Sequence, residues 1–412
     1  MPRRGHHPTN TMQFDLPLRE RRRTVKSHRQ GKPLRVAGLF AGIGGIELGL
    51  HNAGHSTTLL CEIEPAAQAV LKARFPGVPL HDDVTTLRRL KGTVDLVAAG
   101  FPCQDLSQAG RTHGIRGRQS GLVAHVFELL KEHAVPWVIL ENVPFMLRLE
   151  GGRAMEYLVT ELERLKYRWA YRVIDSRAFG LPQRRERVYL VASLTDDPRH
   201  VLFSGNLEAP GDSRRLNGAA CGFYWTEGNT GLGWAQDAIP TLKGGSTVGI
   251  PSPPAILMPS GDLVTPDIRD AERLQGFHAG WTKPAEQVAR PGFRWKLVGN
   301  AVTVDVAQWI GSRLLDLAGD AEATGEPLIR GHPWPHSAWY DGSRRYAAHY
   351  STWPIRRRPR PLADFLKYPS APLSVKATSG FYRRATASTL RFPVGFLQAV
   401  EAHLRRMQQP AV

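Results

Sequence analysis

A cysteine that follows a Gly-Phe-Pro turn is the residue of this 412-residue chain best suited to chemistry. The segment Gly100-Phe101-Pro102-Cys103-Gln104 comes directly after the apolar run 94–99, which predicts a buried strand. A thiol at the carboxyl end of such a strand lies where open α/β sheets bind their ligands. Residues 104–121 are rich in Gly, Arg, Gln and Ser and predict a long loop able to close over a substrate. An inert buried cysteine is the alternative, but the turn and the polar loop favour a reactive thiolate.

Three consecutive strand ends near the N-terminus suit an adenosine-type ligand. The strand-like run 34–40 ends in the glycine turn 41–45, and a helical pattern follows, as in nucleotide-binding sheets. The next predicted strand, 56–61, ends at Glu62, where Rossmann-like sheets bind ribose hydroxyls. The pair Asp82-Asp83 marks a third strand end. Each feature has a structural alternative. The glycines can form only a tight turn, Glu62 can be a solvated carboxylate near a helix start, and the two aspartates can cap a turn.

A second carboxylate, Glu141, follows an apolar strand and is expected at the same sheet edge as Cys103. Further along, Arg185 and Arg187 alternate ahead of another strand, so they point to one face of an extended segment. A surface ion-pair ladder with Glu186 is the alternative. The sequence therefore places a thiol and a carboxylate at one sheet edge, and two guanidinium groups on one face of a later extended segment.

Composition is that of a soluble globular protein, with 42% apolar and 22% charged residues. The three cysteines are far apart and contain no CxxC pair, which predicts a reducing compartment and neither a disulfide framework nor a metal site. No apolar run approaches the roughly 20 residues that span a bilayer. The basic N-terminal segment lacks the apolar stretch of a secretory signal. We therefore expect a cytoplasmic protein.

The formal charge of +17 is concentrated at the two ends of the chain. Residues 1–35 carry a net +8 and residues 331–412 a net +10, whereas residues 36–330 carry −1. Two basic ends around a neutral body favour a polyanionic partner, most simply nucleic acid. The alternative is that the charges only solvate flexible ends.

Residues 320–412 form a basic extension in which aromatic residues alternate with prolines and arginines. The aromatic residues concerned are Trp334, Trp339, Tyr340, Tyr346, Tyr350 and Trp353. Such a mixture suits nucleic-acid backbones and exposed bases, but an arm packed on the body explains it equally, and we favour the arm for 330–375. Residues 392–407 predict a short amphipathic helix, and residues 1–33 a disordered tail.

The order of these motifs resembles the cytosine carbon-5 DNA methyltransferases of bacterial restriction-modification systems. The matching segments are Phe40-Ala41-Gly42-Ile43-Gly44-Gly45, Gly100 to Gln104, Glu141-Asn142-Val143, Gln183 to Arg187, Arg269-Asp270-Ala271-Glu272-Arg273-Leu274-Gln275-Gly276-Phe277 and Gly299-Asn300-Ala301-Val302. The resemblance implies an α/β, Rossmann-like S-adenosylmethionine-dependent methyltransferase fold with a small irregular target-recognition domain. The implied domains are the tail 1–33, a catalytic domain 34–195 completed by 296–318, a recognition domain 196–295, and the basic extension 320–412.

The resemblance also implies S-adenosylmethionine as the cofactor. Phe40 and the glycines would hold its methionine part together with residues returning from a C-terminal helix at 300–318. Glu62 would take the ribose hydroxyls, Ile63 would pack on the adenine, and Asp83 would accept from the adenine amino group. The implied cofactor residues are Phe40, Gly42, Ile43, Gly44, Gly45, Glu62, Ile63, Asp83, Val84, Pro102, Leu122, Asn300 and Val302.

In the implied reaction, the Cys103 thiolate adds to carbon 6 of cytosine and makes carbon 5 nucleophilic. Glu141 would hydrogen-bond N3, and Arg187 would hold the carbonyl oxygen with Arg185 in support. The target base must be flipped out of double-stranded DNA, and the site is expected to be short, roughly four to six base pairs. The implied DNA-binding residues are Gln104, Ser107 and Arg118 in the lid and Thr241, Lys243 and Gly244 in the recognition domain.

Two other functions remain open at this point. The same machinery methylates cytosine in RNA, and the Phe101-Pro102 pair favours DNA only mildly. A DNA-binding protein with a dead catalytic centre is disfavoured, because Cys103, Glu141 and Arg187 are all present. We expect a monomer that acts on double-stranded DNA, with a cognate restriction endonuclease acting separately.

Overall fold

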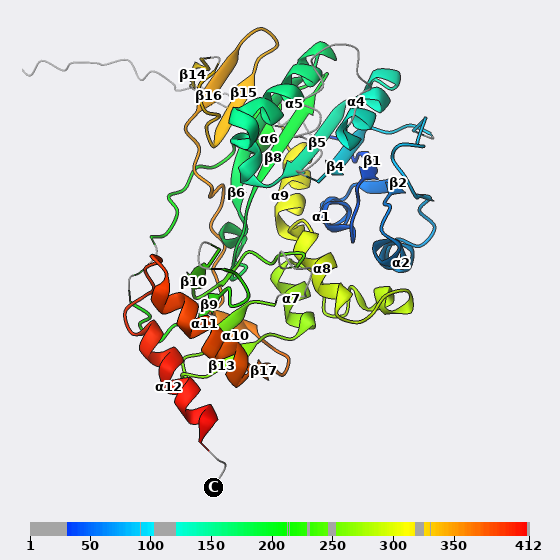
Figure 1. Cartoon of the computed structure of the whole chain (residues 1–412). Helices are drawn as coiled ribbons and strands as arrows, with labels where there is room; N and C mark the ends of the chain where they lie inside the picture. The colour runs from blue at the N-terminus through cyan, green and yellow to red at the C-terminus, as the bar shows by residue number, and fades with distance from the viewer. Residues whose placement is uncertain are drawn as a thin grey trace, which may run out of the picture.

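A ten-stranded β-sheet with helices on both faces dominates the fold (Figure 1). The computed structural model describes residues 31–90, 92–102, 121–211, 213, 215–228, 231–245, 253–317, 325–329 and 331–409. The strands are β1 Arg35–Leu39, β2 Ser56–Cys61, β3 Leu80–His81, β4 Leu96–Gly100, β5 Trp137–Asn142, β6 Arg168–Asp175, β8 Glu186–Ser193, β14 Gly325–Pro327, β15 Ser337–Tyr340 and β16 Arg345–Ala348. Their order is β14-β16-β15-β6-β8-β5-β4-β1-β2-β3. Neighbours pair in parallel from β3 to β5 and antiparallel from β5 to β14.

Helices cover both faces of this sheet. They are α1 Gly45–Asn52, α2 Pro65–Arg74, α4 Leu122–Glu132, α5 Arg153–Arg164, α6 Arg199–Leu202 and α9 Val304–Leu315. In β4, Val97 and Ala99 pack in the core that contains α4 and α5, whereas Leu96 and Ala98 pack in the core that contains α1 and α9. The predicted strands correspond to β1, β2, β4, β5 and β8. Burial on both faces explains the continuous apolar runs in β4 and β5. No helix in the described ranges is long and apolar enough to cross a membrane.

The helix expected at 300–318 is divided differently. Helix α8 (Phe293–Asn300) ends at Asn300, Ala301 is extended with φ −66° and ψ 150°, and α9 begins at Val304. The intervening β-branched residues Val302 and Thr303 lose side-chain freedom in a helix. Asn300 is therefore the last residue of α8, and Val302 lies in the connection between the two helices.

A second, five-stranded antiparallel sheet lies beyond β8, in the lower half of Figure 1. Its strands are β9 Cys221–Phe223, β10 Trp234–Gln236, β12 Ala255–Leu257, β13 Leu263–Thr265 and β17 Ala371–Pro372, in the order β10-β9-β12-β13-β17. The helices of this region are α7 Ile268–Leu274, α8, α10 Leu362–Phe365, α11 Val375–Ala387 and α12 Phe396–Gln408, and a two-stranded pair joins β7 Gln183–Arg184 to β11 Ile239–Pro240. Phe223 packs against Phe381 and Phe396, with ring centroids 4.5 and 5.2 Å apart. Helix α12 confirms the amphipathic helix predicted at 392–407.

The C-terminal extension contributes to both sheets. Strand β15 pairs with β6, and β17 pairs with β13 (Figure 1). Trp339 and Trp353 are buried, and the other four aromatic residues of the 334–353 segment are partly buried against the two cores of the large sheet. The described part of the extension is thus a packed arm, and packing accounts for the aromatic residues that suggested nucleic-acid contacts.

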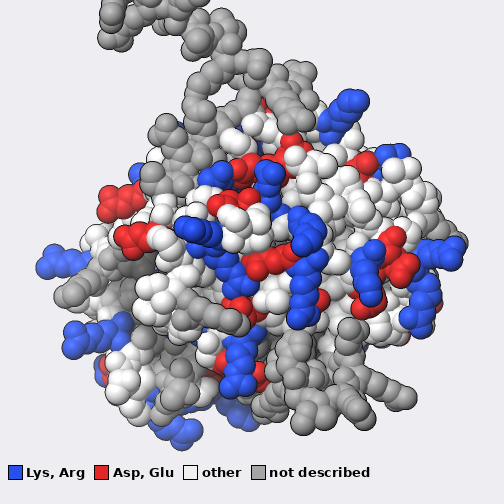
Figure 2. Space-filling view, turned by 90° about the horizontal axis from the view of Figure 1, so that it is seen from above, with Lys and Arg blue, Asp and Glu red and all other residues white. Residues whose placement is uncertain are grey.

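Charged side chains of both signs share the upper face of the molecule. Figure 2 shows Lys and Arg interspersed with Asp and Glu across this face. Arg345 of the extension, for example, pairs with Glu156 at 2.8 Å and with Glu163 at 2.7 Å on α5. Some of the positive charge of the extension is therefore used in ion pairs within the protein.

A buried carboxyl in α1 makes stability depend on pH. Glu47 is buried against Gly38 of β1, and burial raises its pKa to about 8. Folded protein keeps this proton to a higher pH than unfolded chain, whose value lies near 4.5. The free energy of unfolding should therefore fall as the pH rises from 4.5 to 8, by about 1.4 kcal/mol per pH unit at most.

We expect Glu47→Gln to remove this contribution. Urea unfolding of both proteins at pH 6 and pH 8 measures it, because other titrating groups cancel in the difference. The variant should gain about 2 kcal/mol relative to the wild type between the two pH values. If the difference in unfolding free energy between the two proteins is the same at pH 6 and pH 8, Glu47 is not protonated in the folded protein.

Candidate active site

A cavity of about 490 Å³ opens at the carboxyl ends of β1, β2, β4 and β5. Its walls come from the ends of these strands, from the start of α4 and from the end of α8. The lining residues are Phe40, Gly42, Ile43, Cys61, Glu62, Ile63, Glu64, Ala67, Asp83, Val84, Gly100, Phe101, Pro102, Leu122, Glu141, Asn142, Val143, Arg185, Arg187, Lys296, Leu297, Gly299 and Asn300. The structure thus brings together the predicted carboxylates, arginines and most of the predicted cofactor residues. Lys296 is a lining residue that the sequence did not suggest.

The glycine turn contributes to the cavity in two ways. Gly42 has φ +56°, and a Cβ there would meet nothing within 4 Å, so its backbone faces open space. A Cβ on Gly44 would overlap the Phe75 ring, and one on Gly45 would overlap the carbonyl oxygen of Val302. Gly44, Gly45 and Val302 therefore act by close packing behind the cavity and are absent from its lining.

Carboxylates and one apolar side chain lie where the adenosine is expected. Glu62 accepts hydrogen bonds from the backbone N–H groups of Gly42 at 2.7 Å and Glu64 at 2.8 Å, and burial raises its pKa. Asp83 accepts from the N–H of Thr85 at 2.8 Å, which lowers the pKa of Asp83. The Ile63 side chain is 67% exposed. This apolar surface lies beside fixed carboxylates. It suits a nucleoside, whose flat base can pack on Ile63 and whose ribose hydroxyls and amino group can donate to the carboxylates.

An ion pair lies at the other end of the cavity. Glu141 is only 7% exposed, and its Oε1 lies 3.2 Å from Nε of Arg187. Burial raises the pKa of Glu141, whereas the charges of Arg187 and Arg185 oppose the rise. A Cβ on Gly100 would come within 3.3 Å of the carboxylate, so the glycine leaves room for it. Arg187 thus pairs with Glu141 in the cavity, which differs from the surface ladder with Glu186.

Arg185 is fully buried and binds three backbone carbonyls. It donates to Leu242 at 3.0 Å, Gly299 at 3.2 Å and Ala301 at 2.6 Å. Burial, the largest of several causes, lowers the pKa of Arg185 to about 9. This arginine therefore fixes the 241–244 segment and the end of α8 against β8, beside its neighbour Arg187.

Asn142 holds the turn that precedes the predicted nucleophile. Its Nδ2 donates to the carbonyl of Phe101 at 2.9 Å, and its Oδ1 accepts from the N–H of Val143 at 2.8 Å. The sequence placed Asn142 in a motif without assigning it a role. Cys103 itself, with Gln104, Ser107 and Arg118, lies outside the described residues.

The predicted DNA-binding residues of the 241–244 segment lie beside the cavity. The Thr241 hydroxyl donates to the carbonyl of Arg184 at 2.8 Å, and Lys243 Nζ donates to Glu227 at 3.0 Å. A Cβ on Gly244 would overlap the Asn300 side chain. The segment is therefore seated against the residue at the end of α8 that lines the cavity.

Two buried glutamines connect the same segments. Gln183 donates to Oε1 of Gln275 at 3.2 Å and accepts from the N–H of Leu242 at 3.0 Å. Gln275 donates in turn to the carbonyl of Val298 at 2.9 Å. Both glutamines lie in motifs of the sequence, but their positioning roles depend on partners from distant parts of the chain and were not predicted.

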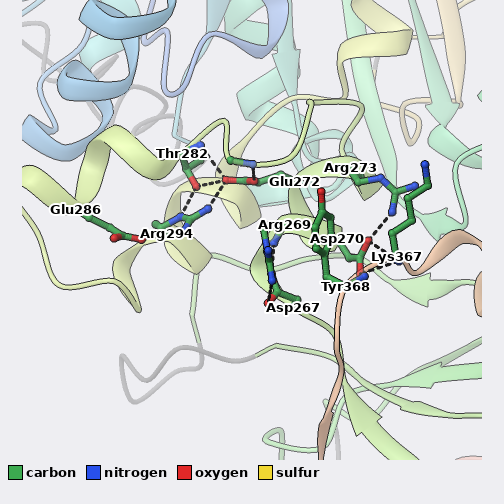
Figure 3. A network of polar contacts seen from close by, with 11 residues as sticks. Asp267, Arg269, Asp270, Glu272, Arg273, Thr282, Glu286, Arg294, Lys367 and Tyr368 are labelled. Carbon is green, nitrogen blue, oxygen red and sulfur yellow. Dashed lines mark hydrogen bonds and ion pairs between the residues drawn. The ribbon is translucent and has the colours of Figure 1, made fainter.

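The motif at 269–277 builds a polar network on α7 outside the cavity lining (Figure 3). Glu272 accepts from the N–H of Thr282 and from Arg294, both at 2.8 Å. Asp270 binds Arg273 and accepts from the backbone N–H of Lys367 at 3.1 Å. This motif thus anchors α7 to α8 and to the C-terminal extension.

Comparisons with known proteins identify relatives of this chain. The family model for C-5 cytosine-specific DNA methylase matches residues 34–214. The Type II methyltransferase M2.BsuMI of Bacillus subtilis (strain 168) is 48% identical over 386 residues, which cover 89% of this chain and 97% of that protein. M.DsaV of Dactylococcopsis salina is 27% identical and covers 69% of this chain and 86% of its own. The crystal structure of S. pombe Dnmt2 methyltransferase is similar with a TM-score of 0.47 and 18% identity, over 68% of this chain and 98% of that one.

Proposed function

Because the chain belongs to the C-5 cytosine-specific DNA methyltransferases of bacterial restriction-modification type, we propose that it methylates a flipped-out cytosine through a Cys103 adduct. One observation carries the proposal. Strand β4 pairs in parallel with β5, and Gly100 lies opposite Glu141. The turn that leads to Cys103 therefore begins beside the Glu141–Arg187 pair.

The cavity fits S-adenosylmethionine as the methyl donor, in which a sulfonium centre activates the methyl group. The open backbone of Gly42 offers space for the methionine part next to Phe40. Glu62, whose carboxylate is fixed by two backbone N–H groups, would accept from the ribose hydroxyls. Ile63 would cover the adenine, and Asp83 would accept from its amino group. Val84, Pro102 and Leu122 would complete the apolar wall.

The residues at the other end of the cavity would activate the cytosine. The Cys103 thiolate would form a bond to carbon 6, and the ring electrons would move to carbon 5, which would take the methyl group as the bond between the methyl group and the sulfonium sulfur breaks. Transfer of the carbon-5 proton to a solvent base and departure of the Cys103 sulfur as a thiolate would then restore the ring. Glu141 would donate its proton towards N3, and Arg187 would bind the carbonyl oxygen. Arg185 would support Arg187 and hold the 241–244 segment and the end of α8 beside the cavity.

Burial of Glu141 also supports base flipping. A base stacked in a duplex cannot reach a carboxyl that is 7% exposed at the end of a cavity. We propose that residues 196–295 form the recognition domain, to whose five-stranded sheet the extension adds β17. The product would protect the DNA of the cell from an endonuclease that acts as a separate protein, and the methyltransferase would act as a monomer.

Bisulfite sequencing tests the function. Purified protein is incubated with unmethylated plasmid DNA, with and without S-adenosylmethionine. Protected cytosines in one short recurring sequence, only with the cofactor, are expected. No protected cytosine, from folded protein that binds the cofactor, would refute the proposal.

Glu141→Gln should lower turnover about 10²- to 10⁴-fold, because an amide donates a hydrogen bond but cannot deliver a proton. Burial raises the pKa of Glu141. Wild-type turnover should therefore fall as the pH rises through this raised pKa, because Glu141 then loses its proton. Single-turnover methylation across pH measures both effects, with the melting temperature as a folding control. Equal turnover of the two proteins would exclude Glu141 from proton transfer.

A further inference from the structure

The ammonium group of Lys243 is held in a fixed position. Its Nζ donates to Oε1 of Glu227 at 3.0 Å and lies 3.9 Å from the centroid of the Tyr224 ring. The Tyr224 hydroxyl donates to the carbonyl of Thr241 at 2.6 Å, so the ring and the lysine segment hold each other. An ammonium carries three N–H donors. Glu227 uses one of them, and the ring covers one side of the group.

This lysine lies next to the catalytic cavity. The carbonyl of Leu242 accepts from Arg185, and Gly244 abuts Asn300, so both neighbours of Lys243 in the sequence are fixed to the active site. A base contact made from this position would fall close to the flipped cytosine.

Helix α11 of the C-terminal extension holds Glu227, the partner of Lys243, in place. Arg384 donates to the carbonyls of Trp225 at 2.5 Å and Glu227 at 3.1 Å. It thereby fixes the turn that carries the Glu227 carboxylate. A residue far along the chain thus supports the position of Lys243.

Exposure and charge favour a base contact over a phosphate contact. The Lys243 side chain is 36% exposed and that of Glu227 only 11%. The ammonium is therefore accessible while the carboxylate neutralises it, which weakens attraction to phosphate. A fixed donor next to an acceptor suits a base edge, and the most frequent specific contact of lysine is with O6 and N7 of guanine.

We propose that Lys243 reads a guanine close to the target cytosine, and that Glu227, Tyr224 and Arg384 position it. The proposal rests on the proposed methylation of double-stranded DNA. It makes Lys243 a specificity-determining residue and gives helix α11 of the extension a part in target recognition.

A library of duplexes randomised around the wild-type site tests the proposal through bisulfite sequencing. Lys243→Gln should lose about 10- to 100-fold of discrimination at one position, which is guanine in the wild-type site. The other positions should keep their preference. An equal loss of turnover on all sequences, unchanged discrimination, or relaxation at a position other than guanine would each overturn it.

Three further variants keep the test decisive. Glu227→Gln is nearly isosteric and should relax the same guanine to a smaller extent; unchanged discrimination in this folded variant overturns the proposal even if Lys243→Gln fails to fold. Arg384→Met should also relax that position, whereas Arg383→Met, which removes the same charge from an exposed neighbour on α11, should not. Equal specificity of these two arginine variants would refute the role of Arg384. Methylation by the wild type in the same assay separates failure of this proposal from failure of the proposed function.

Discussion

Cys103→Ser is expected to abolish methylation while the protein still binds S-adenosylmethionine and DNA. Removal of a nucleophile costs an enzyme on the order of 10⁴-fold or more, and a serine hydroxyl is far less ionised than a thiol at neutral pH. Neither of the other cysteines can take over. Burial raises the pKa of both Cys61 and Cys221 to about 12, so they remain protonated thiols.

A duplex with 5-fluorocytosine at the target position measures the adduct directly. Fluorine cannot leave as the carbon-5 proton does, so the sulfur stays bound to carbon 6 and the complex survives denaturing electrophoresis. The wild type and a Cys221→Ala control should form this complex, and Cys103→Ser should not. Methylation by Cys103→Ser at the wild-type rate would disprove the covalent route.

Deleting the residues after Leu317 should prevent the second sheet from folding. The deletion removes β17 and takes Leu373, Phe381, Phe396 and Val400 out of the core of that sheet. Each such side chain contributes about 1.5–3 kcal/mol when buried, against a total stability of about 5–15 kcal/mol. It also removes β15 and leaves β6 as an exposed sheet edge, which promotes aggregation.

Limited proteolysis and thermal unfolding of the truncated protein measure this outcome. A matched pair on α11 refines it: Phe381→Ala should cost about 3–5 kcal/mol, and the exposed Lys376→Ala less than about 0.5 kcal/mol. A truncated chain that unfolds cooperatively and methylates normally would show that the extension is dispensable.

The central strands were predictable from the sequence because their signal is local. Runs such as 137–140 are apolar throughout and are bounded by turns, and the glycine turn and Glu62 follow such runs directly. Strand β6 was not predicted from the sequence, because Arg172 interrupts its apolar pattern. That arginine is buried only because it binds carbonyls of Leu202, Gly205 and Ser351, which the fold brings together from far away.

The candidate site divides in the same way. The family resemblance implied that Glu141 and Arg187 bind the same cytosine, and the structure pairs their side chains. The clamp of Arg185 on three carbonyls, and the glutamines that support it, depend on the approach of α8 and the 241–244 segment. No periodicity within one segment encodes such an approach. The roles of Cys103 and of the DNA-binding residues remain predictions.

The C-terminal extension adds strands to both sheets, and this limits when each sheet can be completed during synthesis on the ribosome. Tyr171 of β6 pairs with Ala338, and Val264 of β13 pairs with Pro372. A domain normally folds as it emerges, at about 5–20 residues per second of synthesis. Here the edges of both sheets stay unpaired at β6 and β13 until residues 337–372 have been synthesised. Both sheets are therefore completed only at a late stage of synthesis, after most of the chain has emerged.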